Sequence, residues 1–208
     1  MQAAADKISE DIKLAKEDLS EVYEESKKAD EEAKNATESF NKADKQAKSY
    51  ENKLNSKKVE YEKAQNEVKN AESDVASTEQ SVNSAEGDLS AAQSSLSELE
   101  ASLNSASDEE KPAIETKIAE AKKRVADAEN NLDKAKEAHD KANKKLGKAK
   151  EGETKAKEAF EQAQQAYDTA KEAADEAQAK MNEAVENSNN LKQEAENLEK
   201  EINANEEA

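Results

Sequence analysis

The side chains that could carry out acid–base or metal chemistry in this chain are one histidine and many carboxylates. His139 is the only histidine, cysteine is absent, and Asp and Glu together number 50. Adjacent carboxylates recur at Glu24–Glu25, Glu31–Glu32, Glu109–Glu110 and Glu206–Glu207. Carboxylate pairs catalyse proton transfer when an enclosed site shifts their pKa values apart, and a zinc site needs several nitrogen or sulfur ligands. The elements that position these residues decide whether either chemistry is available.

Those elements are indicated by apolar residues that recur at alternating three- and four-residue steps. The first ladder runs backwards from Leu103 through Leu99 and Leu96 to Ile12 and Ile8. The second ladder runs forwards from Ile114 through Ile118, Ala121 and Val125 to Leu198 and Ile202. Apolar residues at this spacing form one stripe along a helix, and another helix must cover that stripe.

The segment between the two ladders ends both the pattern and the helix. It contains Pro112, the only proline, which would be costly inside a continuous helix. Ser107 or Asp108 can cap the following helix, and nearby carboxylates suit the positive end of its dipole. The sequence predicts one elongated all-α domain over residues 1–208. Its parts are a helix over 3–105, a turn over 104–112 and a helix over 109–205.

The two ladders also fit each other in an antiparallel arrangement. A short turn makes the numbers of facing residues sum to about 217, so that Leu99 faces Ile118 and Phe40 faces Ala177. Large residues repeatedly face small ones, which permits close helix packing. The same register places His139 opposite Thr78 and the basic tract 141–150 opposite an acidic stretch. We therefore predict a long antiparallel two-helix coiled-coil hairpin.

Glycines and two charged ladder residues leave an alternative open. Gly147 and Gly152 lie off the stripe, and each weakens a helix by about 1 kcal/mol relative to alanine. A second turn near 147–153 would give an elongated three-helix bundle instead. Lys57 and Glu153 occupy ladder positions, where they either set the register or, with the two glycines, form a hinge.

Composition excludes several classes of function. The chain has 34% hydrophobic and 39% charged residues, with a net charge of −18. This acidic balance argues against nucleic-acid binding, which needs a basic surface. No apolar run reaches the roughly 20 residues of a membrane span, so membrane insertion is not expected. A two-helix rod encloses no site for the carboxylates or for His139, so we expect no enzymatic activity, no cofactor and no metal.

Two regions are candidates for protein binding. The turn presents four polar residues that a partner could contact, namely Ser107, Asp108, Glu109 and Glu110. Small residues at Ala159, Ala166 and Ala173 widen the apolar stripe of the second helix and could admit a third helix, either from a second copy or from a partner protein.

Two stretches resemble the helical regions of Gram-positive surface proteins. They are EEKPAIETKIAEAKKRV, at 109–125, and KAKEAFEQAQQAYDTAK, at 155–171. The resemblance is to pneumococcal surface protein A-like proteins and to related streptococcal and enterococcal adhesins, whose coiled-coil regions share such Ala/Lys/Glu heptads. It implies display outside the cell from the cell wall, as a fragment of a larger wall-attached protein, and binding of a host protein.

These observations favour a coiled-coil stalk or interaction module of a bacterial surface protein. The alternative is an adaptor or scaffold hairpin whose tip docks a partner protein, as in the periplasmic adaptors of efflux and secretion systems. The arginine-leucine-serine type motif that marks the tips of those adaptors is absent from 104–112. A cytoplasmic spacer arm is the alternative for location.

Overall fold

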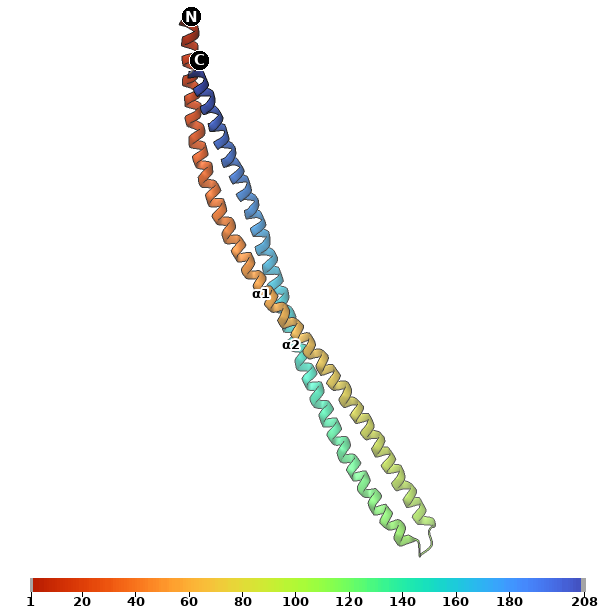
Figure 1. Ribbon diagram of the computed structural model, residues 1–208. Helices are drawn as coiled ribbons and strands as arrows, with labels where there is room; N and C mark the ends of the chain where they lie inside the picture. Colours follow the sequence, from red (N-terminus) through yellow and green to blue (C-terminus); the bar gives the residue numbers. More distant parts are fainter. Residues whose placement is uncertain (1, 207–208) are drawn as a thin grey trace. The chain divides into compact units, whose positions relative to one another are not determined.

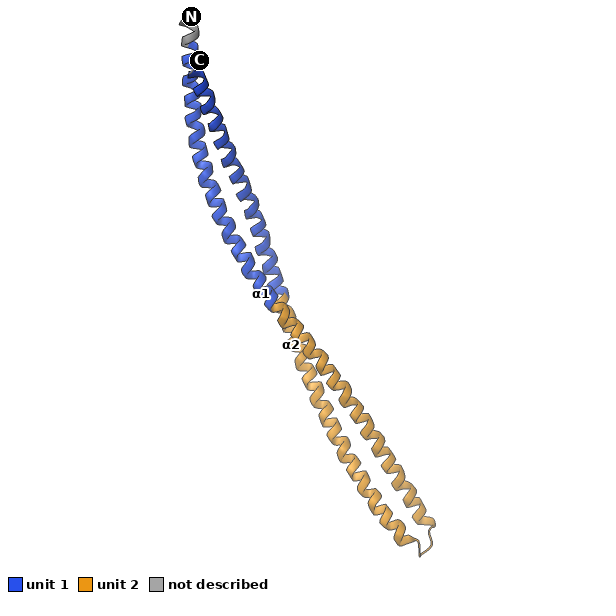
Figure 2. Cartoon of the chain, in the orientation of Figure 1, with its two compact units in different colours: residues 1–56, 161–208 blue, residues 57–160 orange. Residues whose placement is uncertain are grey.

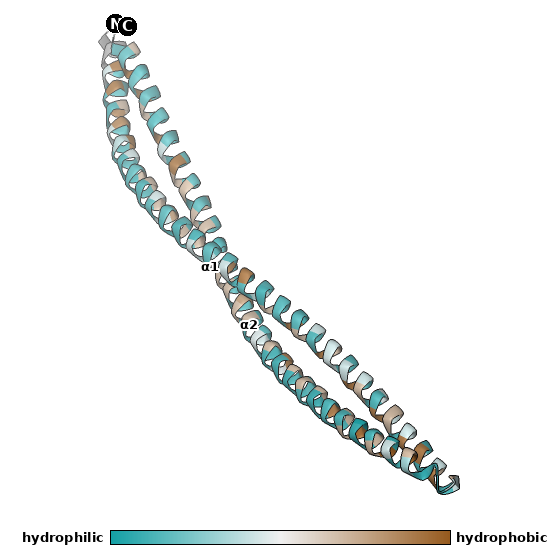
Figure 3. Ribbon diagram, turned by 60° about the horizontal axis from the view of Figure 1, so that its bottom comes forward, coloured by the Kyte–Doolittle hydropathy of each residue, from teal (hydrophilic) through white to brown (hydrophobic). Residues whose placement is uncertain are grey.

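Two α-helices joined by a short turn make up the chain. The computed structural model describes residues 2–206, with side chains described from residue 7 onward. Helix α1 spans Gln2–Ser105 and helix α2 spans Lys111–Glu206. The helices run side by side in opposite directions in both views (Figures 1 and 3). The predicted antiparallel coiled-coil hairpin is confirmed.

The alternative three-helix bundle is wrong, because α2 continues without interruption through 147–153. Both glycines in this segment are exposed, and a methyl group added to either would meet no atom within 4 Å. Their cost is therefore limited to helix propensity, about 1 kcal/mol each. A loop here would instead break the phase of the second ladder and uncover the stripe beyond it.

The turn occupies residues 106–110, and α2 starts two residues later than the expected position 109. The Ser107 carbonyl accepts from the N–H groups of both Glu110 and Lys111, and the Glu110 carbonyl accepts from Ala113 and Ile114. Pro112 is the second residue of α2, where its missing N–H costs little. Proline has no N–H to donate, so Pro112 makes no backbone hydrogen bond as a donor. Regular backbone hydrogen bonding of α2 continues after it.

The hairpin divides into two compact units, each built from a piece of both helices (Figure 2). Unit 1 comprises residues 1–56 and 161–208, and unit 2 comprises residues 57–160. The buried residues of unit 1 are Ser26, Ala29, Ala174, Ser188, Ala195 and Ile202. Those of unit 2 are Val68, Ala71, Ala85, Ile118, Ala121, Ala128, Leu132 and Ala142. All of them lie on the two ladders.

Burial follows the ladders closely. Ladder residues from Ile12 to Leu103, and from Ile114 to Ile202, are buried or half-buried, and Tyr50 is the exception. Outside this stripe both ribbons are mainly hydrophilic, as Figure 3 shows in teal. Each helix therefore supplies the cover that the other helix requires.

Contacts across unit 2 identify the register. His139 Nδ1 lies 3.2 Å from the Thr78 hydroxyl, and these residue numbers sum to the expected 217. The ring centroids of Tyr61 and Phe160 lie 6.0 Å apart, from neighbouring layers. Ion pairs flank the stripe, and they join Lys122 to Glu100, Lys136 to Glu86, Lys145 to Asp74 and Lys150 to Glu72. The last two confirm that the basic tract 141–150 faces acidic residues of α1.

The tight packing of small ladder residues gives a direct test. Ala71 is 0% exposed, so Ala71→Leu has no space for its added atoms, and we expect a loss of about 1–3 kcal/mol of stability. Ala76→Leu is the matched control, because Ala76 is exposed on the same helix. Thermal unfolding followed by circular dichroism measures both. Equal midpoints for the two variants would contradict close packing around Ala71.

Candidate functional site

The tip of the hairpin is ordered by hydrogen bonds between Ser107 and Glu110 that form the carboxylate half of a capping box, called the capping box below. The Glu110 carboxylate accepts hydrogen bonds from the Ser107 backbone N–H at 3.1 Å and from the Ser107 hydroxyl at 2.7 Å. A Glu three residues after an N-cap Ser satisfies a backbone donor that the helix leaves unpaired. These bonds, first that from the hydroxyl, hold the pKa of Glu110 below its usual range. The turn therefore has a defined conformation.

The other tip candidates are exposed at the same turn. Asp108 forms an ion pair with Lys111 at 2.7 Å, and Glu109 lies beside it. The structure thus brings Ser107, Asp108, Glu109 and Glu110 together within one turn, as their adjacency requires. Carboxylates this exposed lack the enclosure that acid–base catalysis needs. What the tip presents to a partner protein is its negative charge and the shape of its turn.

A polar layer interrupts the apolar stripe of unit 2 at His139. The Thr78 hydroxyl donates to the Asp74 or Val75 carbonyl oxygen, each 2.9 Å away, and so can accept from His139 Nδ1. Thr78 and His139 are both half-buried in the stripe. Such a layer specifies register, because sliding the helices would leave these polar groups unpaired. The contact agrees with the predicted position of His139 opposite Thr78 and gives the histidine a structural role.

Unit 1 contains a second polar layer, which the sequence analysis missed. Buried Ser188 donates a hydrogen bond to the Asp30 carboxylate, which also pairs with Lys192 Nζ at 2.6 Å. Lys192 and then Ser188 hold the pKa of Asp30 below its usual range. The available signal was the presence of serine at ladder positions 26 and 188, where alanine or leucine is usual. This layer fixes the alignment of α1 and α2 within unit 1.

The four hinge candidates all lie in unit 2, in two parts of the chain. Lys57 is half-buried and pairs with Glu60 on its own helix at 2.7 Å, while Glu153 is half-buried on α2. Gly147 and Gly152 lie on the exposed side of α2. The Lys57 ammonium is thus paired within α1. Phe160, which faces Lys57 in the predicted register, stacks on Tyr61. A hinge at these residues stays a prediction.

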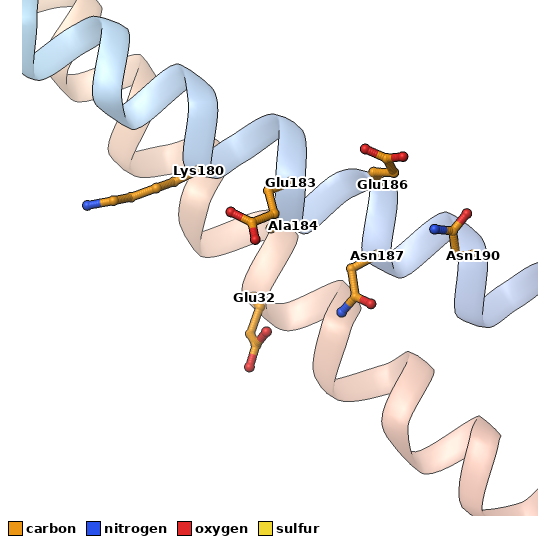
Figure 4. A pocket seen from close by; sticks show the side chains of 7 residues that line it. All are labelled: Glu32, Lys180, Glu183, Ala184, Glu186, Asn187 and Asn190. Carbon is orange, nitrogen blue, oxygen red and sulfur yellow. The ribbon is translucent and has the colours of Figure 1, made fainter.

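Several shallow grooves open to solvent lie along the described helices. One groove of about 440 Å³ lies in unit 1 and is lined by Glu32, Lys180, Glu183, Ala184, Glu186, Asn187 and Asn190. In Figure 4 its charged side chains, among them Lys180, Glu186 and Glu32, extend outward from the helices. Within the described part of the chain, no cluster of His, Cys, Asp or Glu could hold a metal ion. Neither described helix contains a stretch apolar enough to cross a bilayer.

A second groove of unit 1 contains part of the expected self-association face. Its volume is about 610 Å³, and it is lined by Gln46, Tyr50, Gln162, Gln165, Ala166, Thr169, Ala170 and Ala173. Ala166 and Ala173 are therefore brought together, while Ala159 lies in unit 2 and outside this lining. Tyr50 was not predicted from the sequence, although a tyrosine facing another tyrosine, Tyr167, is a visible departure from the large-against-small pattern.

Comparison with known proteins identifies the fold. A coiled-coil segment (residues 345–468 and 694–814) of Pyrococcus yayanosii Smc superposes with a TM-score of 0.68 and 17% sequence identity. The match covers 99% of this chain and 92% of that segment. Its two parts come from distant regions of Smc, whereas here a turn of five residues joins the helices. No protein-family model and no curated protein matches this chain.

The capping box predicts an unusual titration at the tip. Because its hydrogen bonds favour the charged form, the Glu110 carboxylate should titrate below its ordinary pKa of 4.5, whereas Ser107→Ala should bring the midpoint back toward that value. The stabilisation is present above pH 4.5 and is lost as the pH falls through the lowered pKa. Carbon-detected NMR titration of the protein and of the Ser107→Ala variant measures this. A Glu110 midpoint that the substitution leaves unchanged would contradict the capping box.

The open space beside the glycines predicts that alanine is tolerated at both. Gly147→Ala and Gly152→Ala should each stabilise α2 by about 1 kcal/mol, since alanine favours the helix and meets no atom. Gly87→Ala, equally unobstructed on α1, is the comparison. Amide hydrogen exchange then tests the hinge. Faster amide exchange near 147–153 than near 87, and slower exchange there in the alanine variants, would support a hinge. Uniform protection along the helices would contradict a hinge.

Proposed function

We propose that this chain is a non-enzymatic spacer and interaction module of a bacterial cell-surface protein. The observation that supports it is the continuous pairing of two helices of 104 and 96 residues. A rise of 1.5 Å per residue gives each helix a contour length of about 150 Å. Both layers of polar contacts hold the helices in one alignment. Because the apolar residues form one stripe between the two helices, the fold provides a long exposed surface and not an enclosed cavity.

The cell-surface location is supported by the resemblance of the Ala/Lys/Glu heptads to those of Gram-positive surface proteins. The exposed faces are rich in charge of both signs, which suits a module that stays soluble while presenting its sides to a host protein. The groove at Tyr50 is the part of these sides best suited to contact another helix, including one from a second copy.

An adaptor hairpin whose tip docks a partner is the second candidate. The capping box favours it, because a turn held by hydrogen bonds binds with less loss of conformational freedom than a mobile loop. In this role, Asp108 and Glu109 are the contacts that a basic partner surface would meet.

Surface display is tested on intact cells of the source organism. An antibody raised against the 208-residue chain should label intact cells, and external protease should remove the signal while sparing a cytoplasmic marker. Labelling that requires permeabilisation would contradict the surface assignment and favour a cytoplasmic arm. Immunoblotting of lysed cells verifies that the chain is expressed. An absence of labelling on intact cells then cannot be due to absence of the protein.

A photo-crosslinking amino acid distinguishes the two roles. Placed at position 109, it should capture a protein of defined mass if the tip docks a partner, whereas the same probe at position 79, on the exposed side of α1, should not. Capture at the side position without capture at the tip supports the interaction module and argues against the adaptor.

A further inference from the structure

The groove at Tyr50 differs from the rest of this highly charged surface. Its eight lining residues carry no charge, although 39% of the chain is charged. On α1 it is lined by Gln46 and Tyr50, and on α2 by glutamine, threonine and alanine side chains. Depletion of charge around an exposed aromatic residue is characteristic of the centre of protein interfaces.

Tyr50 is exposed for an identifiable reason. It occupies a ladder position but faces Tyr167, so two aromatic rings compete for one layer, whereas Phe40 and Leu54 face alanines. Tyr167 is half-buried, and Tyr50 remains 36% exposed, with the Lys53 ammonium 4.9 Å from its ring centroid. The hairpin thus leaves Tyr50 more exposed than Tyr167, beside the alanines of α2 that line the groove.

Charges on the two rims of the groove are opposite in sign. On α1, Lys42 lies one turn from Gln46, and Lys53 lies over Tyr50. On α2, Glu172 follows Thr169 by three residues and Glu176 follows Ala173 by three, which places them along the other rim. All four charged residues are exposed. A basic rim and an acidic rim on one face make that face complementary to itself.

We propose that this face binds a second copy of the chain, with the two hairpins aligned in parallel about a two-fold axis that runs along the groove. This operation lays α1 of each copy over α2 of the other. The alternative two-fold axis, across the groove, would set α1 on α1 and bring Lys42 and Lys53 of both copies together. Charge therefore selects the parallel arrangement.

The register supplies the level of each contact. Residues whose numbers sum to about 217 lie at one level of the hairpin, and the proposed axis preserves level. Tyr50 then lies over Ala166 and Ala170 of the second copy. Lys42 lies at the level of 175, between Glu172 and Glu176 of that copy. The large-against-small pairing that holds each hairpin together is repeated between the copies.

The association is expected to be weak. Eight lining residues on each side form a patch smaller than the roughly 800 Å² per partner of stable complexes. Unit 1 also contains 27 acidic and 14 basic side chains, so the copies repel each other at long range. At 0.15 M salt the screening length is about 8 Å, which reduces this repulsion more than it reduces contact pairs. This inference specifies the partner of the interaction module and does not depend on cellular location.

Sedimentation equilibrium of the full chain at 0.15 M NaCl, up to about 1 mM, tests the proposal. The mass should rise from monomer toward dimer with a dissociation constant above about 10 µM. Lys42→Glu should weaken the dimer about tenfold, because the two-fold axis repeats each lost pair. Adding Glu172→Lys and Glu176→Lys to it should restore association. Lys34→Glu, an equal charge change on an exposed residue outside the groove, is the control.

Cysteine crosslinking tests the orientation, because the chain contains no cysteine of its own. A mixture of Lys42→Cys and Glu176→Cys chains should form the mixed disulfide in preference to either homodimer. Predominant crosslinking of position 42 to itself would overturn the parallel arrangement. A monomeric mass at every concentration, or equal effects of Lys42→Glu and Lys34→Glu, would overturn the second-copy assignment and leave a helix of another protein as the occupant. Surface labelling of cells is unaffected by these results.

Discussion

Each helix of this chain has one apolar stripe, and within residues 7–206 the stripe of one helix covers the stripe of the other. That constraint accounts for most of what the structure shows. The stripes meet at one register, so alanines on one side accommodate larger residues on the other. Little else is buried among residues 7–206, and their ionisable groups lie mainly on the exposed flanks, at half-buried ladder positions or in polar layers. Length and surface are what such a fold provides for function.

Polar residues placed within the stripe specify the alignment. A uniform row of alanines and leucines would tolerate sliding by a heptad at small cost. The Thr78–His139 contact and the Asp30 cluster each lose their partners on sliding, so they favour a single alignment. Exposed ion pairs add little energy individually, yet their consistent spacing reinforces the same register. One such layer lies in each of the two units.

The proposed functions depend on the surfaces that this fold leaves exposed. The likeness to a coiled-coil segment of Smc, at 17% identity, concerns architecture alone. The tip is a turn ordered by a capping box, and the groove at Tyr50 is an uncharged surface with rims of opposite charge. The first would suit a docking partner and the second a further helix. Neither offers the enclosure that catalysis requires.

The sequence by itself determined the two helices, their break near Pro112 and their pairing, because a stripe of period 3.5 and a short turn allow one antiparallel solution. It also indicated the Thr78–His139 layer and the facing charges of the basic tract. Only the tertiary structure decided that α2 continues through Gly147 and Gly152, since propensity alone could not weigh two glycines against the loss of packing. Side-chain geometry likewise decided which ring, Tyr50 or Tyr167, is the more exposed. That choice depends on the space between the two packed helices, which cannot be read from the sequence of either ladder alone.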